Sequence, residues 1–391
     1  MFSIQMSLLQ NYVDDNLDIG EDIIEHWRTH PNIELKENNE LYLLKYTKTP
    51  KNDFLKELRG IIFEKTTNKI INFPLKGKIS YNEFKNLVNW KDCVIEESID
   101  GSLINLYWYN NKWNISTKGT IDANCYWNCD ISFKDLFINA AFISGLNYNI
   151  LKKNFCYSFV LCHPAIRNVT KYLKPEIYHI CSRNLETFRE SDEEIGIMKP
   201  KVLKIGDIAQ DNSFNSLNLN NYEDLENSLL NLDFSKEGYM LYSMDRKYRT
   251  KLKGEGHKKV LKLKGNHPNI VYRILEIRLN KDVLKEFIDY YREYLTKIEE
   301  TELNIDKLSK KVLNLYTVVK KVKPSNEIDI PKIYKKIIYD LHQEYKKLMD
   351  KYDPNVHTYK PNINLRKVVH YLNNDIDTTY LYLLLKDISS N

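Results

Sequence analysis

Two lysines separated by one residue, Lys251 and Lys253, are the first feature of this sequence with a clear chemical use. They lie in a run typical of a β-strand, in which alternate side chains point to the same face. Two ammonium groups on one face can neutralise a phosphate group while it is transferred. Glu237 and Gly238 come shortly before them. A carboxylate can hold Mg²⁺, and a glycine lets the backbone come close to a ligand. The four residues together indicate phosphate chemistry, whereas either pair alone would be a weak signal.

The stretch 94–104 is the element that must position such a site. It predicts a strand, a tight turn at Asp100-Gly101 and a second strand, followed by a polar turn and a returning strand over 112–117. Taken alone, this stretch would be an ordinary strand turn. Its importance comes from the order of the motifs around it.

Further strands and helices are predicted on either side of this stretch. Short apolar runs bounded by turn residues predict strands, and apolar residues at helical spacing predict helices. The predicted strands cover residues 40–46, 58–64, 69–73, 155–164 and 177–181. The predicted helices cover residues 21–28, 121–150 and 221–230, the last within a polar, acidic insert at 185–232.

From residue 269 onward the apolar pattern becomes helical, and prolines separate the helices. These helices are predicted over residues 270–279, 283–298, 305–322, 330–349 and 365–385. The chain is therefore predicted to be α+β. We expect a domain of antiparallel sheets with helices over residues 1–268 and an all-helical C-terminal domain over residues 269–391.

Composition sets the class of protein. The 391 residues are enough for two or three domains, and 42% hydrophobic with 28% charged residues is typical of a globular protein and not of a disordered one. The net charge of +5 permits a nucleic-acid partner without requiring one. A lysine-rich helix face with Lys320, Lys321 and Lys323 is directed either to solvent or to RNA. The six cysteines lack Cys-x-x-Cys spacing, and no apolar run has the length of a membrane span. We expect a reduced, cytoplasmic monomer with no membrane partner.

The order of several motifs resembles the ATP-dependent RNA ligases of the phage T4 RNA ligase 1 type. The matching motifs are Arg59-Gly60, Asp100-Gly101-Ser102, Lys118-Gly119, Glu237-Gly238 and Lys251-x-Lys253. The resemblance implies a covalent nucleotidyltransferase domain with the ATP-grasp-like adenylation fold of ligases, followed by a helical domain. It also implies ATP and Mg²⁺ as cofactors. The implied partner is RNA with 5′-phosphate ends, such as nicked tRNA, in the manner of a viral RNA repair protein in the host cytoplasm.

The same resemblance implies roles for individual residues. The implied nucleotide contacts are Arg59, Glu97, Gly101, Lys118, Ser158 and Gly238. The implied catalytic positions are Ser98, Asp100, Glu237, Lys251 and Lys253, with Asp100 and Glu237 as metal ligands. Arg59 suits a phosphate clamp because the planar fork of arginine can bond two phosphate oxygens at once.

One departure from the family bears directly on activity. The family has a lysine that attacks the α-phosphate of ATP and then carries AMP as a phosphoramidate, and this chain has Ser98 at that position. A serine lacks both the amine and the reach of a lysine. The chain also has Gly77 where the family has a phosphate-binding lysine, and Ser158 where glutamate is common. We therefore predict a pseudoenzyme that binds ATP and RNA ends without ordinary self-adenylylation.

Other interpretations stay open. In one interpretation the nucleophilic lysine was replaced on purpose. In another, a neighbouring lysine such as Lys76, Lys78 or Lys118 acts in its place. The chain is alternatively a non-ligase nucleotidyltransferase of the capping type, although the helical C-terminal region favours a ligase over an enzyme with an OB domain. A purely structural role is the least specific alternative. The departures at Gly77 and Ser158 favour natural divergence over a single engineered change.

Overall fold

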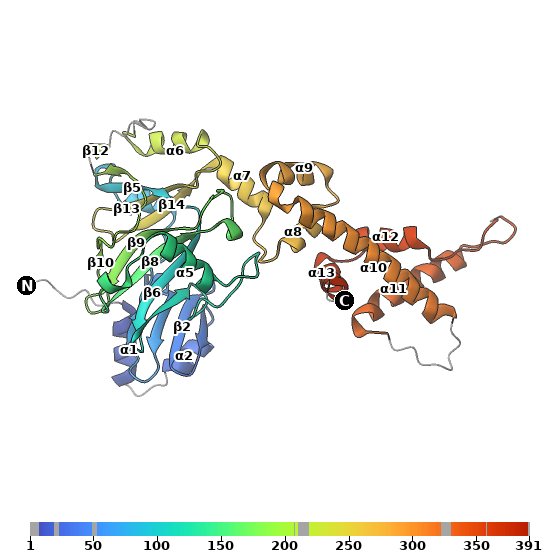
Figure 1. The fold of residues 1–391 in the computed structure, drawn as a ribbon, viewed down its shortest axis with the longest axis horizontal. Coiled ribbons are helices and arrows are strands. Elements are labelled where there is room, and N and C mark those ends of the chain that lie inside the picture. The colour runs from blue at the N-terminus through green and yellow to red at the C-terminus, as the bar shows by residue number, and fades with distance from the viewer. Residues whose placement is uncertain are drawn as a thin grey trace, which may run out of the picture. The chain divides into compact units, whose positions relative to one another are not determined.

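The computed structural model of the chain describes residues 8–18, 23–48, 53–206, 208–209, 219–321, 330–356 and 358–389. The chain divides into two compact units, Met1–Lys262 and Leu263–Asn391 (Figure 1). All described strands belong to the first unit and pair in antiparallel fashion, whereas the second unit is helical. The prediction of an α+β chain with antiparallel sheets and a helical C-terminal region is confirmed. Among the described helices, none is both long enough and apolar enough to cross a membrane.

The first sheet of the first unit has four strands in sequence order. They are β1 (Ile33–Glu37), β2 (Leu41–Tyr46), β3 (Arg59–Glu64) and β4 (Ile70–Asn72). The helices whose residues share the core of this sheet are α1 (Leu8–Asp18), α2 (Ile23–Thr29) and α3 (Asp53–Glu57). Trp27, Tyr42 and Phe63 are fully buried in that core. Strand β1 was not predicted, because only two of its five residues are apolar, and it forms as the edge partner of β2.

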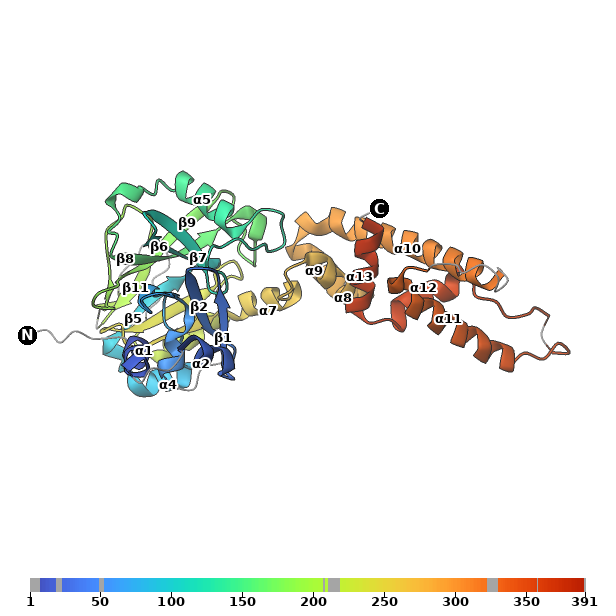
Figure 2. The same ribbon diagram turned by 90° about the horizontal axis from the view of Figure 1, so that it is seen from below.

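The second sheet has the strand order β10-β9-β8-β6-β7. Its strands are β6 (Ser102–Tyr109), β7 (Lys112–Thr117), β8 (Phe155–Cys162), β9 (Glu176–Asn184) and β10 (Glu190–Ser191). Helix α5 (Phe133–Ile143) packs against β8 and β9 (Figure 2). The predicted helix over 121–150 is shorter than expected, because Ser132 caps it by accepting a hydrogen bond from the backbone N–H of Asp135. Two short 3₁₀ helices, η2 (Tyr148–Ile150) and η3 (Pro164–Ile166), flank β8.

The third sheet has the strand order β12-β11-β5-β13-β14. Its strands are β5 (Cys93–Ser98), β11 (Val202–Ile205), β12 (Ile208–Ala209), β13 (Gly238–Ser243) and β14 (Arg249–Lys253). Helices α4 (Tyr81–Leu87) and α6 (Tyr222–Leu230) bury Phe84, Leu225 and Leu229 against this sheet. The short helix η1 (Trp90–Asp92) leads into β5.

The turn after β5 carries the chain from one sheet to another. Strand β5 pairs with β13 in the third sheet, whereas β6 pairs with β7 and β8 in the second. The two strands predicted on either side of Asp100-Gly101 therefore exist but do not form a hairpin with each other. This crossing places residues 98–101 at the junction between two sheets.

The second unit is built from helices around one core that includes Leu308, Tyr334, Ile337 and Leu384. Its helices are α8 (Ile270–Ile277), α9 (Lys281–Tyr290), η4 (Arg292–Tyr294), α10 (Leu295–Lys321), α11 (Lys332–Asp350), α12 (Leu365–Asn374) and α13 (Thr378–Ser389). Helix α7 (Glu255–Lys264) precedes them. The single helix predicted over 365–385 is two helices. The break occurs because the carboxylate of Asp377 accepts the backbone N–H of Tyr380 and starts a new helix.

Candidate nucleotide site

A pocket of about 190 Å³ lies where the three sheets of the first unit meet. Strands β5, β13 and β14 line it from the third sheet, and β6, β8 and β9 line it from the second. Arg59 of β3 and the segment that follows β4 complete the wall. The pocket is smaller than the roughly 300–1,000 Å³ of ordinary small-molecule sites. A whole nucleotide therefore requires its walls to move apart.

Two of the four cationic side chains in the lining already have acidic partners. The ammonium group of Lys251 lies 2.5 Å from the carboxylate of Glu237. The guanidinium of Arg249 lies 3.8 Å from the carboxylate of Glu190. Lys251 is therefore closely paired, whereas Arg249 shares Glu190 with Arg183, which lies 2.5 Å from the same carboxylate.

The other two cations, Arg59 and Lys78, make no ion pair or side-chain hydrogen bond within the described part of the chain. Desolvation and the neighbouring Arg249 lower the pKa of Arg59 to about 10. The side chain of Lys78 is partly exposed to solvent. Its pKa is lowered to about 7, first by partial desolvation at the pocket and then by the nearby cations Lys251 and Arg59. Cations that repel one another and lack carboxylate partners create a site suited to an anion.

The acidic side chains of the lining do not cancel these two cations. Glu96 lies 2.8 Å from Arg246, and Glu97, a predicted nucleotide contact, lies 3.0 Å from Lys236. Both carboxylates are thus occupied by cations of their own. The pocket retains its excess of positive charge.

Ser98 lies in the centre of a cluster that the sequence predicted. Strand register places Ser98 opposite Gly238 and Gly238 opposite Lys253. The Ser98 hydroxyl donates a hydrogen bond of 2.8 Å to Glu237, which also contacts Lys251 at 2.5 Å and Lys253 at 3.1 Å. Burial alone would raise the pKa of Glu237, but the two lysines and the hydroxyl outweigh it and lower that pKa. Predicted catalytic positions from three separate strands or turns are therefore in contact.

Asp100 is held rigidly by the segment that follows β8. Its carboxylate accepts backbone N–H groups from Val169 at 2.9 Å and Thr170 at 2.8 Å, and the side-chain amide of Asn168 at 3.3 Å. Asp100 is only 6% exposed. The Arg167-Asn168-Val169 run therefore positions the turn of the candidate site.

Two glycines predicted to contact nucleotide are required by close backbone packing. A Cβ atom at Gly101 would lie 2.5 Å from the carbonyl oxygen of Leu161 in β8. Gly238 has a φ of +133°, and a Cβ atom there would collide with the backbone of β14 at Leu252 and Lys253. A larger residue at Gly238 would push β13 away from β14, which carries the two lysines, and one at Gly101 would push the turn after Ser98 away from β8.

One buried residue near this cluster was not predicted. Asp100, Glu237 and His257 each offer one ligand atom, and the three atoms lie within 4.8 Å of one another. His257 belongs to the first turn of α7 and is 0% exposed. The signal was its place four residues after Lys253, directly beyond the paired lysines. The sequence repeats the Lys-x-Lys spacing at Lys262 and Lys264, but these two residues lie on helix α7 and not on a strand.

Three of the predicted nucleotide contacts, Gly238, Lys118 and Ser158, are not among the residues that line the pocket. Lys118 stacks over the ring of Tyr46, with 4.4 Å between its ammonium and the ring centroid, in a different hollow. The hydroxyl of Ser158 donates a 2.9 Å hydrogen bond to Asn105 in the buried interior of the second sheet. Their roles in nucleotide binding stay predictions.

The predicted lysine-rich face lies at the end of α10. Lys320 is exposed. Lys323 and the side chain of Lys321 lie outside the described residues.

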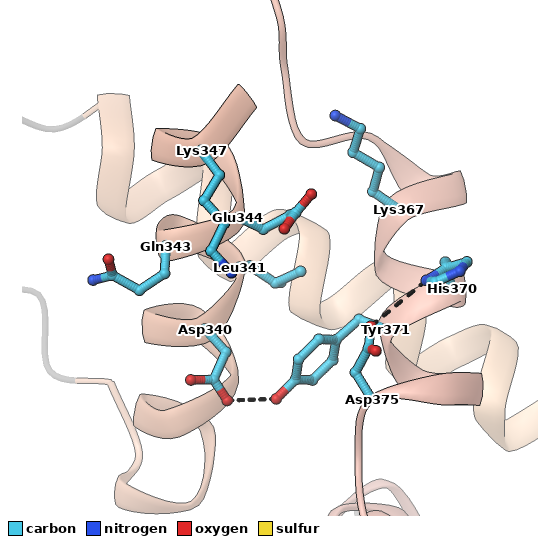
Figure 3. A pocket seen from close by; sticks show the side chains of 9 residues that line it. All are labelled: Asp340, Leu341, Gln343, Glu344, Lys347, Lys367, His370, Tyr371 and Asp375. Carbon is cyan, nitrogen blue, oxygen red and sulfur yellow. Dashed lines mark hydrogen bonds and ion pairs between the residues drawn. The ribbon is translucent and has the colours of Figure 1, made fainter. Parts of the chain in front are cut away.

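A larger hollow of about 570 Å³ lies in the second unit, between α11 and α12 (Figure 3). We call it the helical groove. The Tyr371 hydroxyl donates to Asp340 at 2.5 Å, and His370 lies 3.6 Å from Asp375 (Figure 3). The remaining lining residues are Leu341, Gln343, Glu344, Lys347 and Lys367. Acidic and basic groups alternate in this lining and do not converge on one point.

Comparisons with known proteins show what the sequence as a whole is similar to. No protein-family model matches the chain. The RNA ligase of Rhodothermus phage RM378 is 26% identical over 222 residues, which cover 43% of this chain and 50% of that ligase. The immediate-early protein ICP-46 homolog of Invertebrate iridescent virus 6 is 24% identical over 374 residues, which cover 87% of this chain and 79% of that protein. The predicted resemblance to RNA ligases is confirmed, although the match spans only half the length of the phage ligase.

A solved archaeal ATP-dependent RNA ligase aligns with 72% of this chain and 78% of its own, at 10% identity and a TM-score of 0.42. A structural likeness this distant supports no functional conclusion. The chain is thus related to RNA ligases through its sequence.

Proposed function

We propose that this protein binds ATP with a divalent cation in the pocket of the first unit and binds RNA ends beside it, without forming a covalent adenylate at position 98. The excess of cationic over acidic charge in the pocket is the observation that carries the proposal. Arg59 and Lys78 lack acidic partners in the described part of the chain and line the same wall as Ser98. A nucleotide triphosphate supplies the anionic charge that these cations require.

The contacts around Ser98 explain why binding need not lead to covalent chemistry. A phosphoramidate requires an amine nucleophile, and Ser98 offers a hydroxyl that is already donated to Glu237 at 2.8 Å. Glu237 in turn is neutralised by Lys251 and Lys253, so it is a weak base for removing the serine proton. The loss of one amine leaves the rest of the phosphate site intact.

Isothermal titration of the full chain with ATP tests binding. We expect one site per chain and an affinity at least about 10-fold weaker for Arg59→Gln, because a charge-assisted hydrogen bond contributes roughly 1.5–3 kcal/mol. Lys112→Gln is the matched control, since Lys112 is exposed at the end of β7. Equal affinities of the Arg59→Gln variant and the unaltered chain would contradict the assignment of the pocket.

The RNA part of the proposal rests on the phage relative, which is named an RNA ligase. We expect an RNA oligonucleotide with a 5′-phosphate to bind more tightly than the same oligonucleotide with a 5′-hydroxyl. Affinity should fall steeply with salt because phosphate contacts release counterions. Fluorescence anisotropy at three salt concentrations measures both effects, and equal binding of the two ends would remove RNA ends as the ligand.

A second candidate function is nucleotidyl transfer through Lys78. Of the three neighbouring lysines, Lys76 pairs with Glu57 at 2.8 Å and Lys118 stacks on Tyr46, whereas Lys78 lines the pocket without a partner in the described residues. In this reaction the neutral amine of Lys78 would form a bond to the α-phosphorus of ATP. The bond from that phosphorus to the bridging oxygen would break, pyrophosphate would leave, and the amine would lose one proton to solvent. Mapping of any AMP-modified peptide distinguishes this function from simple binding.

A further inference from the structure

We infer that Asp100, Glu237 and His257 form a binding centre for a first-row transition-metal dication such as Co²⁺ or Zn²⁺. Their ligand atoms lie within 4.8 Å of one another and come from three separate segments: the turn after β5, the residue before β13 and the first turn of α7. All three side chains are buried, with exposures of 6%, 5% and 0%. The three residues are not among those that line the pocket of the proposed function, although Glu237 contacts Ser98 and Lys251 of that lining. The inference does not require bound nucleotide.

His257 provides the strongest evidence. Its Nδ1 atom lies 3.1 Å from the carbonyl oxygen of Phe234. A carbonyl can only accept, so Nδ1 carries the proton and Nε2 keeps its lone pair. Nε2 is buried and has no hydrogen-bond partner within the described residues. An unsatisfied buried acceptor is unfavourable, and a bound cation would give this nitrogen a partner.

The same hydrogen bond is the arrangement that metal-binding histidines use. Such residues usually donate the second ring nitrogen to a carbonyl or carboxylate, which fixes the tautomer and the ring orientation. Here Phe234 serves that purpose, and Gly256 packs closely beside it, since a Cβ atom at Gly256 would lie 3.3 Å from the side chain of Phe234. The first turn of α7 is therefore held in the position that His257 needs.

Asp100 offers one lightly bonded oxygen to a cation, whereas both oxygens of Glu237 already contact other side chains. Asp100 Oδ2 accepts two short backbone bonds, but Oδ1 has one longer contact, with Asn168 at 3.3 Å. Glu237 Oε2 is bonded to Ser98 and Lys251, whereas Oε1 is paired with Lys253 at 3.1 Å. A dication at this centre would therefore compete chiefly with Lys253 for Glu237.

The ligand set indicates which metals are suited to the site. Mg²⁺ prefers oxygen ligands and keeps several waters, so a buried imidazole is a poor ligand for it. Imidazole suits Zn²⁺ and neighbouring transition ions, and carboxylates bind the same ions. Two carboxylates and one imidazole therefore favour Co²⁺ or Zn²⁺ over Mg²⁺. This differs from the Mg²⁺ that the ligase resemblance implies.

Metal titration of the full chain without nucleotide tests the inference. We expect one equivalent of Co²⁺ to bind with a visible absorption band, and Mg²⁺ to bind at least about 10-fold more weakly. His257→Gln should reduce Co²⁺ affinity at least about 10-fold. His370→Gln is the control, because His370 also lies near a carboxylate, Asp375, but on an exposed surface. Co²⁺ binding that His257→Gln leaves unchanged, or that His370→Gln removes, would overturn the assignment.

A second variant keeps the test decisive if His257→Gln fails to fold. Lys253→Gln removes the cation that competes for Glu237 and leaves the three ligands in place. We expect it to tighten Co²⁺ binding, whereas weaker or unchanged binding would count against this centre. ATP titration without added metal is measured in parallel. If the unaltered chain binds ATP but not Co²⁺, the metal centre alone is overturned. If it binds Co²⁺ but not ATP, only the proposed function is overturned.

Discussion

The pocket of the first unit and the helical groove of the second differ in how their charges are balanced. The groove is three times as large, about 570 Å³ against about 190 Å³. Its lining holds three acidic side chains and three basic or imidazole side chains. The pocket is smaller, but two of its cations have no acidic partner among the described residues.

This contrast shows that volume alone does not identify a site. A surface hollow between helices forms wherever side chains of unequal length meet, and its charges are solvated. A pocket whose cations are kept close together without carboxylates is electrostatically unfavourable until an anion enters. Such an arrangement is what distinguishes a ligand site from a gap in packing.

The largest expected effect is a loss of stability when a glycine in the backbone near the pocket is replaced. Gly238→Ala places a Cβ atom against β14 at a φ of +133°, so we expect a loss of about 3 kcal/mol in the free energy of unfolding. Gly145→Ala is the control: Gly145 also has a positive φ, +77°, but nothing lies within 4 Å of its Cβ position. Chemical denaturation of both variants measures the difference. Similar losses would mean that positive φ alone, and not strand packing, requires glycine at 238.

A smaller effect, on ATP affinity, is expected when one lysine in each of the two regions is replaced. Lys251→Gln should weaken ATP binding about 10-fold or more, because it removes a cation of the pocket and leaves Glu237 to repel phosphate. Lys367→Gln in the helical groove should change ATP affinity by less than about 2-fold, since that groove has no excess of cations. Isothermal titration of both variants decides the point. A larger effect at Lys367 would move the nucleotide site to the second unit.

The smallest effect is a pH dependence that only the pocket should show. The pKa of Lys78 is lowered to about 7, first by desolvation and then by Lys251 and Arg59. Lys78 is therefore cationic below pH 7 and loses its charge above it, so ATP affinity should fall a few-fold between pH 6 and pH 8. The phosphates of ATP gain negative charge over part of the same range and act in the opposite direction. Comparison with Lys78→Gln isolates the lysine, and identical profiles would show that Lys78 does not contact ATP.

Much of the fold follows from the sequence. Strands β2, β3 and β8 contain apolar runs bounded by turn residues, and such runs predict a strand without knowledge of its partner. The pairing of strands cannot be predicted in the same way. The turn at Asp100-Gly101 is a local signal for two strands, but their separation into two sheets depends on β8 and β13, which lie far away in the chain. Long-range pairing of this kind is not encoded in a short window.

The candidate site was predicted where its residues belong to ordered motifs. Ser98, Glu237, Lys251 and Lys253 are in contact as expected. His257 was missed because its place four residues after Lys253 gains a meaning only when the fold brings it beside two carboxylates. Lys78 was one of three lysines named as possible substitutes for the nucleophile, but the sequence could not distinguish it from Lys76 and Lys118, because the distinction depends on which lysine has a partner among the described residues.

The central claim is that the pocket binds ATP and that only the amine missing at position 98 prevents covalent adenylylation. The most direct measurement is the intact mass of the unaltered chain and of Ser98→Lys after incubation with ATP and a divalent cation. We predict that the unaltered chain keeps its mass, whereas a fraction of Ser98→Lys gains one AMP. An AMP adduct on the unaltered chain would contradict this account, and its location on Lys78 would establish the second candidate function instead.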